Sequence, residues 1–271
     1  MKNLFDMKGK VVAITGGGGV LGGTIAQSML EAGAKIAILD LREEMVNQRV
    51  KELKTISVEV MGLTTNVLDQ KLLETNRDAI VNQWGQIDIL LNAAGGNMAG
   101  ATIGPDQTIF DLSIEAFQKV TELNLNGSVL PSLVFGQQMA KQKHGVIINF
   151  SSMTAQKTIT RVVGYSAAKA AIDNFTKWMA VEMARKFGEG IRVNAIAPGF
   201  FVGDQNRRLL LNEDGSLTDR GKTIIEHTPM GRFGEAEELN GTIQYLCSEA
   251  SRFVTGIVIP IDGGFSAFSG V

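Results

Sequence analysis

A strand, a glycine-rich turn, a helix and a second strand follow one another directly in residues 10–40. Residues 10–14 (K-V-V-A-I) form a short apolar run of the kind that a parallel strand, buried on both faces, requires. The turn T-G-G-G-G-V-L-G-G spans residues 15–23, and apolar residues at helical spacing then lead to Gly33, the expected C-cap. Residues 35–39 (K-I-A-I-L) are a second strand that ends at Asp40. This order predicts a β-α-β unit within an open parallel sheet.

The turn at residues 15–23 has the composition of a dinucleotide site. Glycines let the backbone approach a pyrophosphate, and the N-terminus of the following helix adds unpaired N–H groups and the positive end of a dipole. A glycine run alone is also compatible with a flexible turn. Its position between a strand and a helix favours the binding turn.

Asp40 bears on which dinucleotide is bound. A carboxylate at the end of the second strand can accept hydrogen bonds from the adenosine ribose hydroxyls and would repel a 2′-phosphate, so it favours NAD over NADP. Arg42 is the opposing signal, because a guanidinium there could bind that phosphate. A solvated position in the first turn of the next helix is its commoner fate.

Strands and helices continue to alternate to the end of the chain, which predicts an α/β fold with a doubly wound, seven-stranded parallel sheet and helices on both faces. We expect one domain over residues 1–271. The other expected strands are 58–63, 87–91, 146–150, 191–195 and 257–261. The expected helices include 69–84, a pattern from 114 toward 142 that Gly127 and Pro131 interrupt, one from near Tyr165 to 187, and 235–247.

Polar and glycine residues follow several of these strands at their carboxyl ends. Asn66 and Val67 follow the third strand, and N-A-A-G-G-N at 92–97 follows the fourth. Ligands of open parallel sheets bind at that edge, so these turns are expected to lie beside the glycine turn. Residues 200–231 then break the alternation, and the Leu209 to Leu211 run within them favours an ordered, partly helical substrate lid.

Composition narrows the range of partners. A net charge of −2 and a pI near 5.8 give no basic excess, so we expect neither nucleic acid nor a membrane surface as a partner. Cys247 is the only cysteine, and the chain has no apolar run of roughly 20 residues and no signal-peptide pattern, so we expect a cytoplasmic protein. We assign no metal site and no chemistry to His144.

Residues 146–169 contain a set of side chains suited to proton transfer. Tyr165 and Lys169 are four residues apart and share one face of a helix, and Ser152 precedes Tyr165 by 13 residues at a strand end. A phenol has a pKa near ~10, so a neighbouring ammonium is expected to lower the pKa of Tyr165. A tyrosine and a lysine at this spacing also occur by chance, and a serine pair after a strand is usually a turn or a cap.

Seven motifs over nearly the whole chain, taken together, are highly specific. They are T-G-G-G-G-V-L-G (15–22), Asp40, N-A-A-G (92–95), N-L-N-G (124–127), the serine pair 151–152, Y-S-A-A-K (165–169) and N-A-I-A-P-G (194–199). With them the chain resembles the short-chain dehydrogenase/reductase family. The resemblance implies a single-domain Rossmann fold, NAD as cofactor and a homotetramer to which apolar helix faces and the C-terminal F-S-A-F-S-G-V segment contribute.

The resemblance also implies a catalytic tetrad. Tyr165 would be the general acid in reduction and the base in oxidation, and Ser152 would hold the substrate oxygen. Lys169 would lower the pKa of Tyr165 and grip the nicotinamide ribose, while Asn124 would position a water in a proton relay. The residues expected at the cofactor are Gly16, Gly18, Gly19, Val20, Leu21, Asp40, Asn66, Val67, Asn92, Ala93, Gly95, Tyr165, Lys169, Pro198, Gly199 and Phe201.

Two positions depart from the family pattern. Val20 stands where the first motif usually has its middle glycine, so the phosphate turn must accommodate a side chain. Residues 200–203 (F-F-V-G) replace a threonine that often touches the nicotinamide carboxamide, so the sequence does not show how that ring is held.

Within the family, P-G-F-F-x-x-x-Q-N-R, the insert through 227–234 and the C-terminal segment look like sugar-acid enzymes, namely D-mannonate oxidoreductases (fructuronate reductases) and then gluconate 5-dehydrogenases. This predicts an oxidoreductase that interconverts a secondary alcohol and a ketone on a sugar acid. The alternatives are a 3-oxoacyl-carrier-protein reductase, against which Asp40 argues, and a non-catalytic dinucleotide-sensing protein.

A substrate carboxylate needs a cation in a closed site, and arginine suits it because its planar fork binds both oxygens. Arg161, four residues before Tyr165, and Arg207, beside Gln205 and Asn206 in the lid, are the candidates, with Asn97 as a further substrate contact. Arg208 and Lys157 are weaker candidates. Each of these cations is equally compatible with a solvated surface position.

Overall fold

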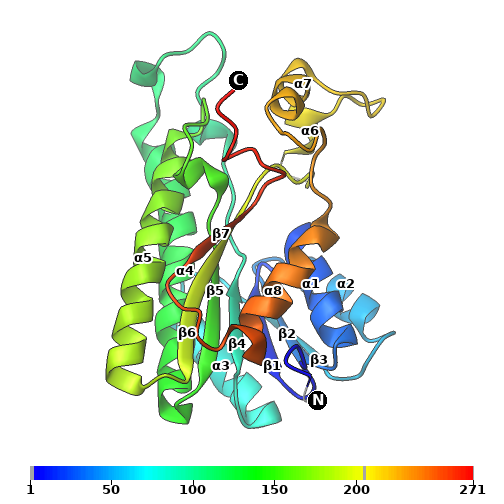
Figure 1. The fold of residues 1–271 in the computed structure, drawn as a ribbon, viewed down its shortest axis with the longest axis vertical. Helices are drawn as coiled ribbons and strands as arrows, with labels where there is room; N and C mark the ends of the chain where they lie inside the picture. Colours follow the sequence, from blue (N-terminus) through cyan, green and yellow to red (C-terminus); the bar gives the residue numbers. More distant parts are fainter. Residues whose placement is uncertain (1–2, 204–205, 271) are drawn as a thin grey trace.

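Seven parallel strands form the centre of the computed structural model, which describes residues 3–203 and 206–270 (Figure 1). The strand order is β3-β2-β1-β4-β5-β6-β7. The chain adds β2 and β3 on one side of β1, then crosses to the other side of β1 and adds β4 to β7 there. The strands are β1 Val11–Thr15, β2 Lys35–Asp40, β3 Val60–Thr64, β4 Ile89–Asn92, β5 Gly145–Phe150, β6 Ile191–Pro198 and β7 Val258–Ile261. This arrangement confirms the doubly wound α/β fold in a single domain.

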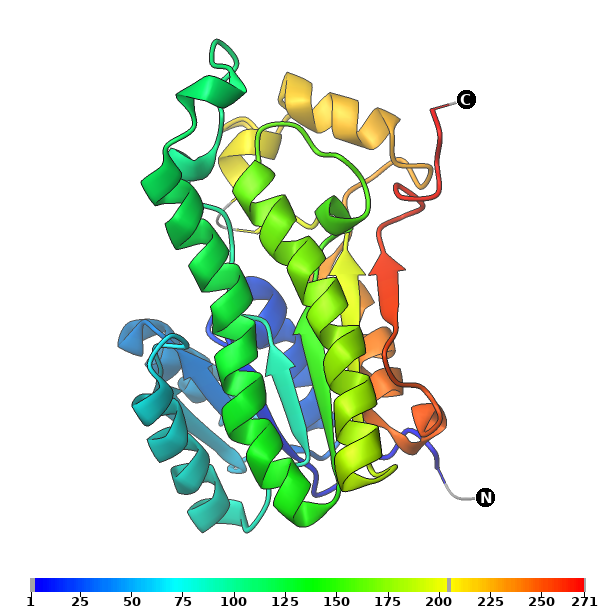
Figure 2. The same cartoon turned by 90° about the vertical axis from the view of Figure 1, so that its left-hand side faces the viewer.

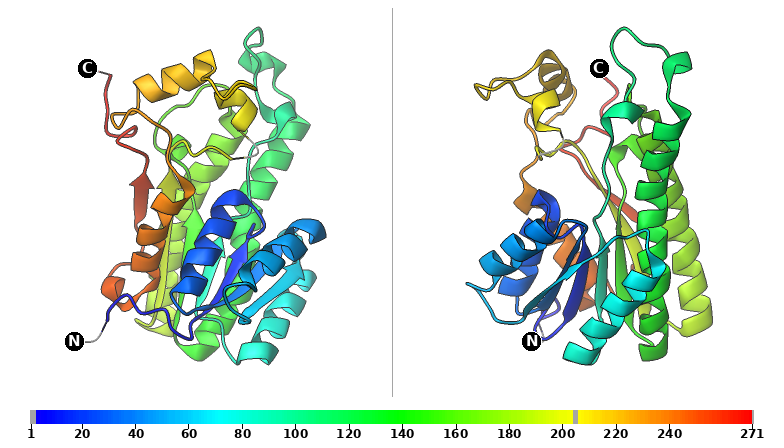
Figure 3. Two further views of the ribbon diagram at one scale, coloured as in Figure 1. Left: turned by 90° about the vertical axis from the view of Figure 1, so that its right-hand side faces the viewer. Right: turned by 180° about the vertical axis from the view of Figure 1, so that it is seen from behind.

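Helices cover both faces of the sheet. Three of them, α3 Gln70–Trp84, α4 Ile114–Gln142 and α5 Val163–Phe187, form one layer (Figure 2). The opposite layer contains α1 Val20–Glu31, α2 Glu43–Leu53 and α8 Asn240–Cys247 (Figure 3). The central strands are buried on both faces, because alternate residues of each strand pack into two separate apolar clusters, one under each helix layer. No helix of the described residues is both long and apolar enough to cross a bilayer.

Several segments differ from the expectation, among them the helix expected over 235–247, which is a 3₁₀ helix at Ala236–Leu239 followed by α8. Helix α4 is continuous through Gly127 and Pro131, both of which are buried. A proline within a helix costs about 3 kcal/mol, and the extensive packing of α4 against α5 offsets it. The third strand begins at Val60 rather than at Val58, because Val58 is 84% exposed and precedes the sheet.

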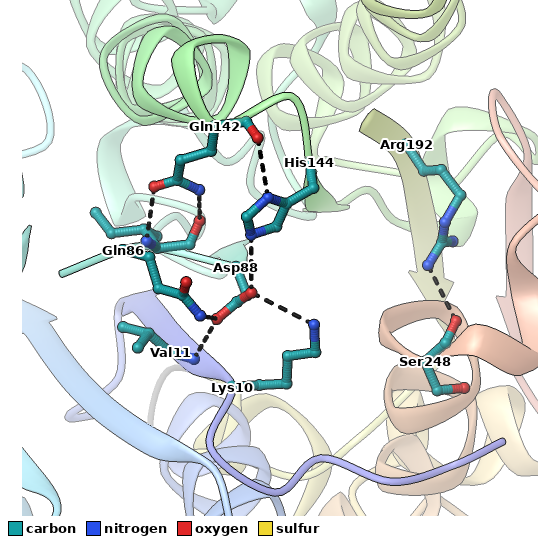
Figure 4. Close-up of polar contacts among 9 residues, drawn as sticks. Lys10, Val11, Gln86, Asp88, Gln142, His144, Arg192 and Ser248 are labelled. Carbon is teal, nitrogen blue, oxygen red and sulfur yellow. Dashed lines mark hydrogen bonds and ion pairs between the residues drawn. The ribbon is translucent and has the colours of Figure 1, made fainter. Parts of the chain in front are cut away.

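The amino-terminal edge of the sheet is held by the buried carboxylate of Asp88 (Figure 4). It accepts the Val11 backbone N–H at 2.8 Å and the Gln86 side chain at 2.9 Å, and Lys10 Nζ lies 3.4 Å from it. His144 Nε2 is 3.2 Å away, so this histidine joins β5 to β4 rather than standing free in a surface loop. Asp88 therefore fixes β1, β4 and β5 at the edge remote from their carboxyl ends.

Residues 200–203 and 206–231 lie beyond the carboxyl ends of the strands (Figure 1). They contain two short helices, α6 Arg207–Leu210 and α7 Asp219–Glu226, joined through a bridge between Leu211 and Leu217. Phe201 forms a β-bridge with Gly234, which joins the start of the segment to the residues that follow its end. The segment is thus ordered and partly helical over its described residues, next to the edge where the strand-end residues gather.

Candidate active site

Tyr165, Lys169 and Ser152 are brought together by β5 and α5. The polar turn after β5 carries Ser152, whose side chain is hydrogen-bonded to the Tyr165 hydroxyl. Lys169 is buried, and its Nζ donates to the Phe150 carbonyl at 2.7 Å. The same nitrogen lies 5.4 Å from the centre of the Tyr165 ring. The three groups therefore converge where the sequence spacing predicts, with the ammonium fixed by the last residue of the strand.

The pKa values of Tyr165 and Lys169 are set mainly by burial. Burial raises the pKa of Tyr165, and the hydrogen bond to Ser152 opposes that rise only in part. Burial also lowers the pKa of Lys169 to about 8, against the opposing charge of Asp173. The expected lowering of the tyrosine pKa is therefore not a property of the protein alone. The phenol is protonated, as a proton donor must be, and a further positive charge is required before it can act as a base.

Asn124 uses its side-chain amide to hold the loop after β4. Its Oδ1 accepts the Gly96 N–H at 3.0 Å, and its Nδ2 donates to the carbonyls of Gly96 at 2.7 Å and Val120 at 2.8 Å. The residue is fully buried in α4. Through these hydrogen bonds the side chain fixes the 93–97 loop beside the cleft.

Asp173 lies one turn after Lys169 in α5 and was not predicted from the sequence. Its carboxylate accepts a hydrogen bond from Ser151, the neighbour of Ser152. Burial raises the pKa of Asp173, while the hydrogen bond from Ser151 and the charges of Lys177 and Lys169 lower it. The only local signal was an acid at helical spacing from the lysine. Asp173 ties the serine turn to α5, and its negative charge raises the pKa of Lys169 against the effect of burial.

A cleft of about 620 Å³ runs along the carboxyl ends of the strands from Asp40 to Tyr165. Most residues expected at the cofactor border it: Gly16, Gly19, Val20, Leu21, Asp40, Asn66, Val67, Ala93, Gly95, Tyr165, Lys169, Pro198, Gly199 and Phe201. Leu41, Arg42, Thr65, Asn206 and other neighbours of these positions complete the lining. The cleft joins the glycine turn to the serine, tyrosine and lysine cluster without a break.

The glycine turn fits a pyrophosphate even with Val20 in place of a glycine. Gly16 has φ +67°, which favours glycine, and a Cβ on Gly22 would lie 2.5 Å from the Gly16 carbonyl oxygen. Val20 is the first residue of α1, and Gly19 before it leaves the helix N-terminus without a side-chain cap. The valine side chain borders the cleft without straining the turn, and the first N–H groups of α1 stay available to an anion.

Asp40 is held in place for a ribose. Its Oδ2 accepts the Gly18 N–H at 3.2 Å, and its Oδ1 accepts the Arg42 N–H at 3.2 Å. Gly18 thus contacts Asp40 rather than bordering the cleft. The Arg42 side chain is 66% exposed and its Nε lies 4.0 Å from Asp40, so it is a solvated group beside the carboxylate. The chain therefore fits a dinucleotide with two free ribose hydroxyls, such as NAD.

Asn92 lies below the cleft instead of in its lining. It is buried, and its Nδ2 donates to Ser132 Oγ and to Asn149 Oδ1, each at 2.8 Å. Asn149 in turn donates to Thr176 in α5 at 2.9 Å. This polar network fixes α4 and α5 on the sheet directly beneath the site.

The segment that replaces the family threonine is shaped by Asn206. Its Oδ1 accepts the Gly203 N–H, its Nδ2 donates to the Phe201 carbonyl, and both distances are 2.8 Å. Phe201 is buried and borders the cleft beside Gly199. The ring of Phe201 and the turn held by Asn206 therefore occupy the segment in which the family pattern has a threonine hydroxyl.

The expected substrate cations are not gathered in this cleft. Arg207 is exposed on α6, and Arg161 is half-buried in the loop before α5. Asn97 donates to Thr102 Oγ1 at 2.7 Å and does not border the cleft. Gln205 lies outside the described residues. Among residues 3–203 and 206–270, no three His, Cys, Asp or Glu side chains gather where they could hold a metal ion.

Comparison with known proteins agrees with this geometry. A family model described as enoyl-(acyl carrier protein) reductase matches residues 19–266. An "uncharacterized oxidoreductase UxuB" of Bacillus subtilis (strain 168) is 44% identical over 275 residues, with 98% of each chain covered. A "2-dehydro-3-deoxy-D-gluconate 5-dehydrogenase" of Dickeya dadantii (strain 3937) is 31% identical over 266 residues, again with 98% of each chain covered.

One solved structure is similar over the whole chain. It is a "putative D-Mannonate oxidoreductase" from Haemophilus influenza with bound NAD, 43% identical, with a TM-score of 0.91 and 98% of each chain covered. The match extends from the glycine turn through the catalytic helix to the last strand. The chain therefore belongs to the short-chain dehydrogenase/reductase family, and it is an NAD-dependent oxidoreductase.

Proposed function

We propose that this enzyme interconverts a secondary alcohol and a ketone on a sugar acid, with D-mannonate and D-fructuronate as the pair. The similarity to the Haemophilus structure named for D-mannonate carries the proposal, because it spans 98% of both chains at 43% identity. The Dickeya relative is named for another sugar acid, which supports the same substrate class. A gluconate 5-dehydrogenase-like activity is the second candidate for that reason.

The proposed proton path uses Tyr165 and Ser152. NAD supplies the hydride acceptor, or NADH the hydride donor, when it is bound in the cleft. In reduction, Ser152 orients the substrate oxygen and the protonated phenol of Tyr165 gives it a proton; in oxidation, the proton returns to the phenolate. Lys169 stabilises that phenolate and would bind the nicotinamide ribose, and the charge of Asp173 favours the ammonium form of Lys169.

An assay of NADH absorbance with candidate ketoacids tests this function. We expect oxidation of NADH with D-fructuronate and reduction of NAD with D-mannonate. Turnover of an acyl-carrier-protein ketoester alone would favour the reductase alternative, and NADH binding without turnover of any ketone would favour a dinucleotide sensor. The retention of both Tyr165 and Lys169 argues against the sensor.

We expect the enzyme to prefer NAD over NADP by at least about tenfold in kcat/KM, equivalent to about 1.4 kcal/mol. The reason is the fixed carboxylate of Asp40, which accepts two backbone N–H groups and faces the ribose end of the cleft. Asp40→Ser should reduce this preference by lowering kcat/KM with NAD and raising it with NADP. Equal use of both cofactors by the wild type would show that Arg42 overrides the carboxylate.

We also propose a homotetramer in the cytoplasm, with interfaces on the outer faces of α4 and α5. Leu133, Trp178 and Val181 are exposed there, and large apolar side chains on a helix surface favour burial against another chain. The C-terminal segment is the other proposed interface, although Val271 lies outside the described residues. Light scattering should report about four times the chain mass of 29.1 kDa, and a single-chain mass would contradict the assembly.

A further inference from the structure

The side chain of Arg49, in α2, contacts the first turn of the neighbouring helix α1. Figure 3 shows the two helices side by side in one layer. Arg49 Nη2 lies 3.5 Å from the carbonyl oxygen of Gly19, which is the N-cap of α1. The same carbonyl accepts the Gly23 N–H at 2.9 Å, the first hydrogen bond of the helix. Arg49 therefore touches α1 at the end where its N–H groups are unpaired.

The guanidinium of Arg49 occupies the space that a side chain at position 23 would need. A Cβ on Gly23 would lie 2.3 Å from Arg49 Cζ and 2.4 Å from both its Nε and its Nη2. The planar group thus lies directly against the backbone of α1, and only glycine leaves room for it. Glycine inside a helix is less stable than alanine, so this contact is made at the expense of the helix.

The charge of Arg49 is poorly matched to the free protein. An ion pair with Glu52 at 2.8 Å holds its Nη1. Its Nε is buried and has no hydrogen-bond acceptor in the part of the chain that the structure describes. The first turn of α1 contains no acidic residue. A cation beside the positive end of a helix dipole is unfavourable, and an anion bound at that end reverses the effect.

The turn that Arg49 contacts is part of the cofactor cleft. Residues 19–22 border the cleft, whereas Arg49 itself does not. Arg49 can therefore act on a bound dinucleotide through the turn and through its charge, without touching it.

We propose that Arg49 is a positioning residue for the pyrophosphate of the dinucleotide. It holds the first turn of α1 so that the N–H groups there face the phosphates, and its positive charge adds to that of the helix end. The proposal concerns cofactor binding alone and is independent of the substrate that the enzyme takes.

The first test replaces Arg49 with methionine and measures binding by calorimetry. We expect the Kd of NADH and of ADP-ribose to rise by about tenfold, because the turn loses its support and the phosphates lose a nearby charge. The Kd of adenosine, which has no phosphate, should stay within about twofold. Arg49→Lys, which keeps the charge but not the planar group, should recover part of the affinity. The control Lys51→Met removes an exposed cation from the same helix and should bind all three ligands as the wild type does.

Gly23→Ala displaces the same guanidinium while its charge is kept. The three atoms nearest to the new methyl group all belong to the end of the Arg49 side chain, which can move away and leave α1 unchanged. Alanine is the better helix former, so the melting temperature should equal or exceed that of wild type. The Kd of NADH should nevertheless rise by about fivefold. A residue that only joined two helices would not produce weaker binding in a protein of undiminished stability.

The double variant Gly23→Ala/Arg49→Met tests whether the alanine acts through Arg49. We expect it to bind NADH as Arg49→Met does, with no further loss. A further loss as large as that in the wild-type background would mean that alanine distorts the turn itself, and would overturn the proposal. Equal losses for adenosine and ADP-ribose in Arg49→Met would also overturn it, as would NADH affinity within about twofold of wild type.

Thermal melting shows whether each variant is folded. If Arg49→Met does not fold, Gly23→Ala decides the proposal, and unchanged NADH affinity in that variant overturns it. No substrate is present in these measurements, so their outcome is separate from that of the sugar-acid assay.

Discussion

Replacement of Tyr165 with phenylalanine is expected to lower kcat by about 10³-fold or more, while the Kd of NADH stays within about threefold of wild type. The phenol hydroxyl is the only group of Tyr165 that the change removes, and the ring remains packed near Lys169. Since the free protein holds this phenol in its protonated form, its proton is the one available to a reduced substrate. Stopped-flow turnover and NADH fluorescence titration measure the two quantities.

Ser166→Ala, at the next position of α5, is a suitable control. Its hydroxyl donates to the Val162 carbonyl at 2.9 Å within the helix. We expect little change in kcat for this variant. A rate near that of wild type for Tyr165→Phe would refute the assignment of the proton donor, and parallel losses of rate and NADH affinity would point to a structural role for the ring.

Lys169→Ala is expected to lose both functions, with kcat lowered by about 10³-fold and NADH affinity by about tenfold or more. One buried ammonium serves two partners, since it stabilises the phenolate and borders the cofactor cleft. Lys186→Ala is a matched control, because Lys186 is an exposed lysine in the last turn of the same helix. A Lys169→Ala variant that binds NADH normally would restrict the lysine to the proton step.

The pKa of Lys169 adds a pH dependence to this prediction. Burial lowers that pKa to about 8 in the free enzyme, so the ammonium is charged below this pH and neutral above it. NADH affinity should therefore fall as the pH rises through about 8, and this fall should be absent from Lys169→Ala. An unchanged pH profile in the variant would assign the dependence to another group.

The sequence alone determined the order of strands and helices and the type of sheet. Continuous apolar runs are typical of parallel strands buried between two helix layers, and a glycine turn between a strand and a helix favours a close backbone approach to a dinucleotide. The spacing of Tyr165 and Lys169 on one helix likewise fixed their proximity before any fold was known. Their convergence with Ser152 followed from the rule that parallel strands present their carboxyl ends at one edge.

Tertiary structure decided how individual side chains are used, because that depends on contacts between residues far apart in the sequence. Asn92 and Asn124 both belong to recognisable motifs, yet one fixes helices beneath the site and the other clamps Gly96. The expected fall in the tyrosine pKa did not occur in the protein alone, since burial, which spacing does not reveal, outweighs the hydrogen bond from Ser152.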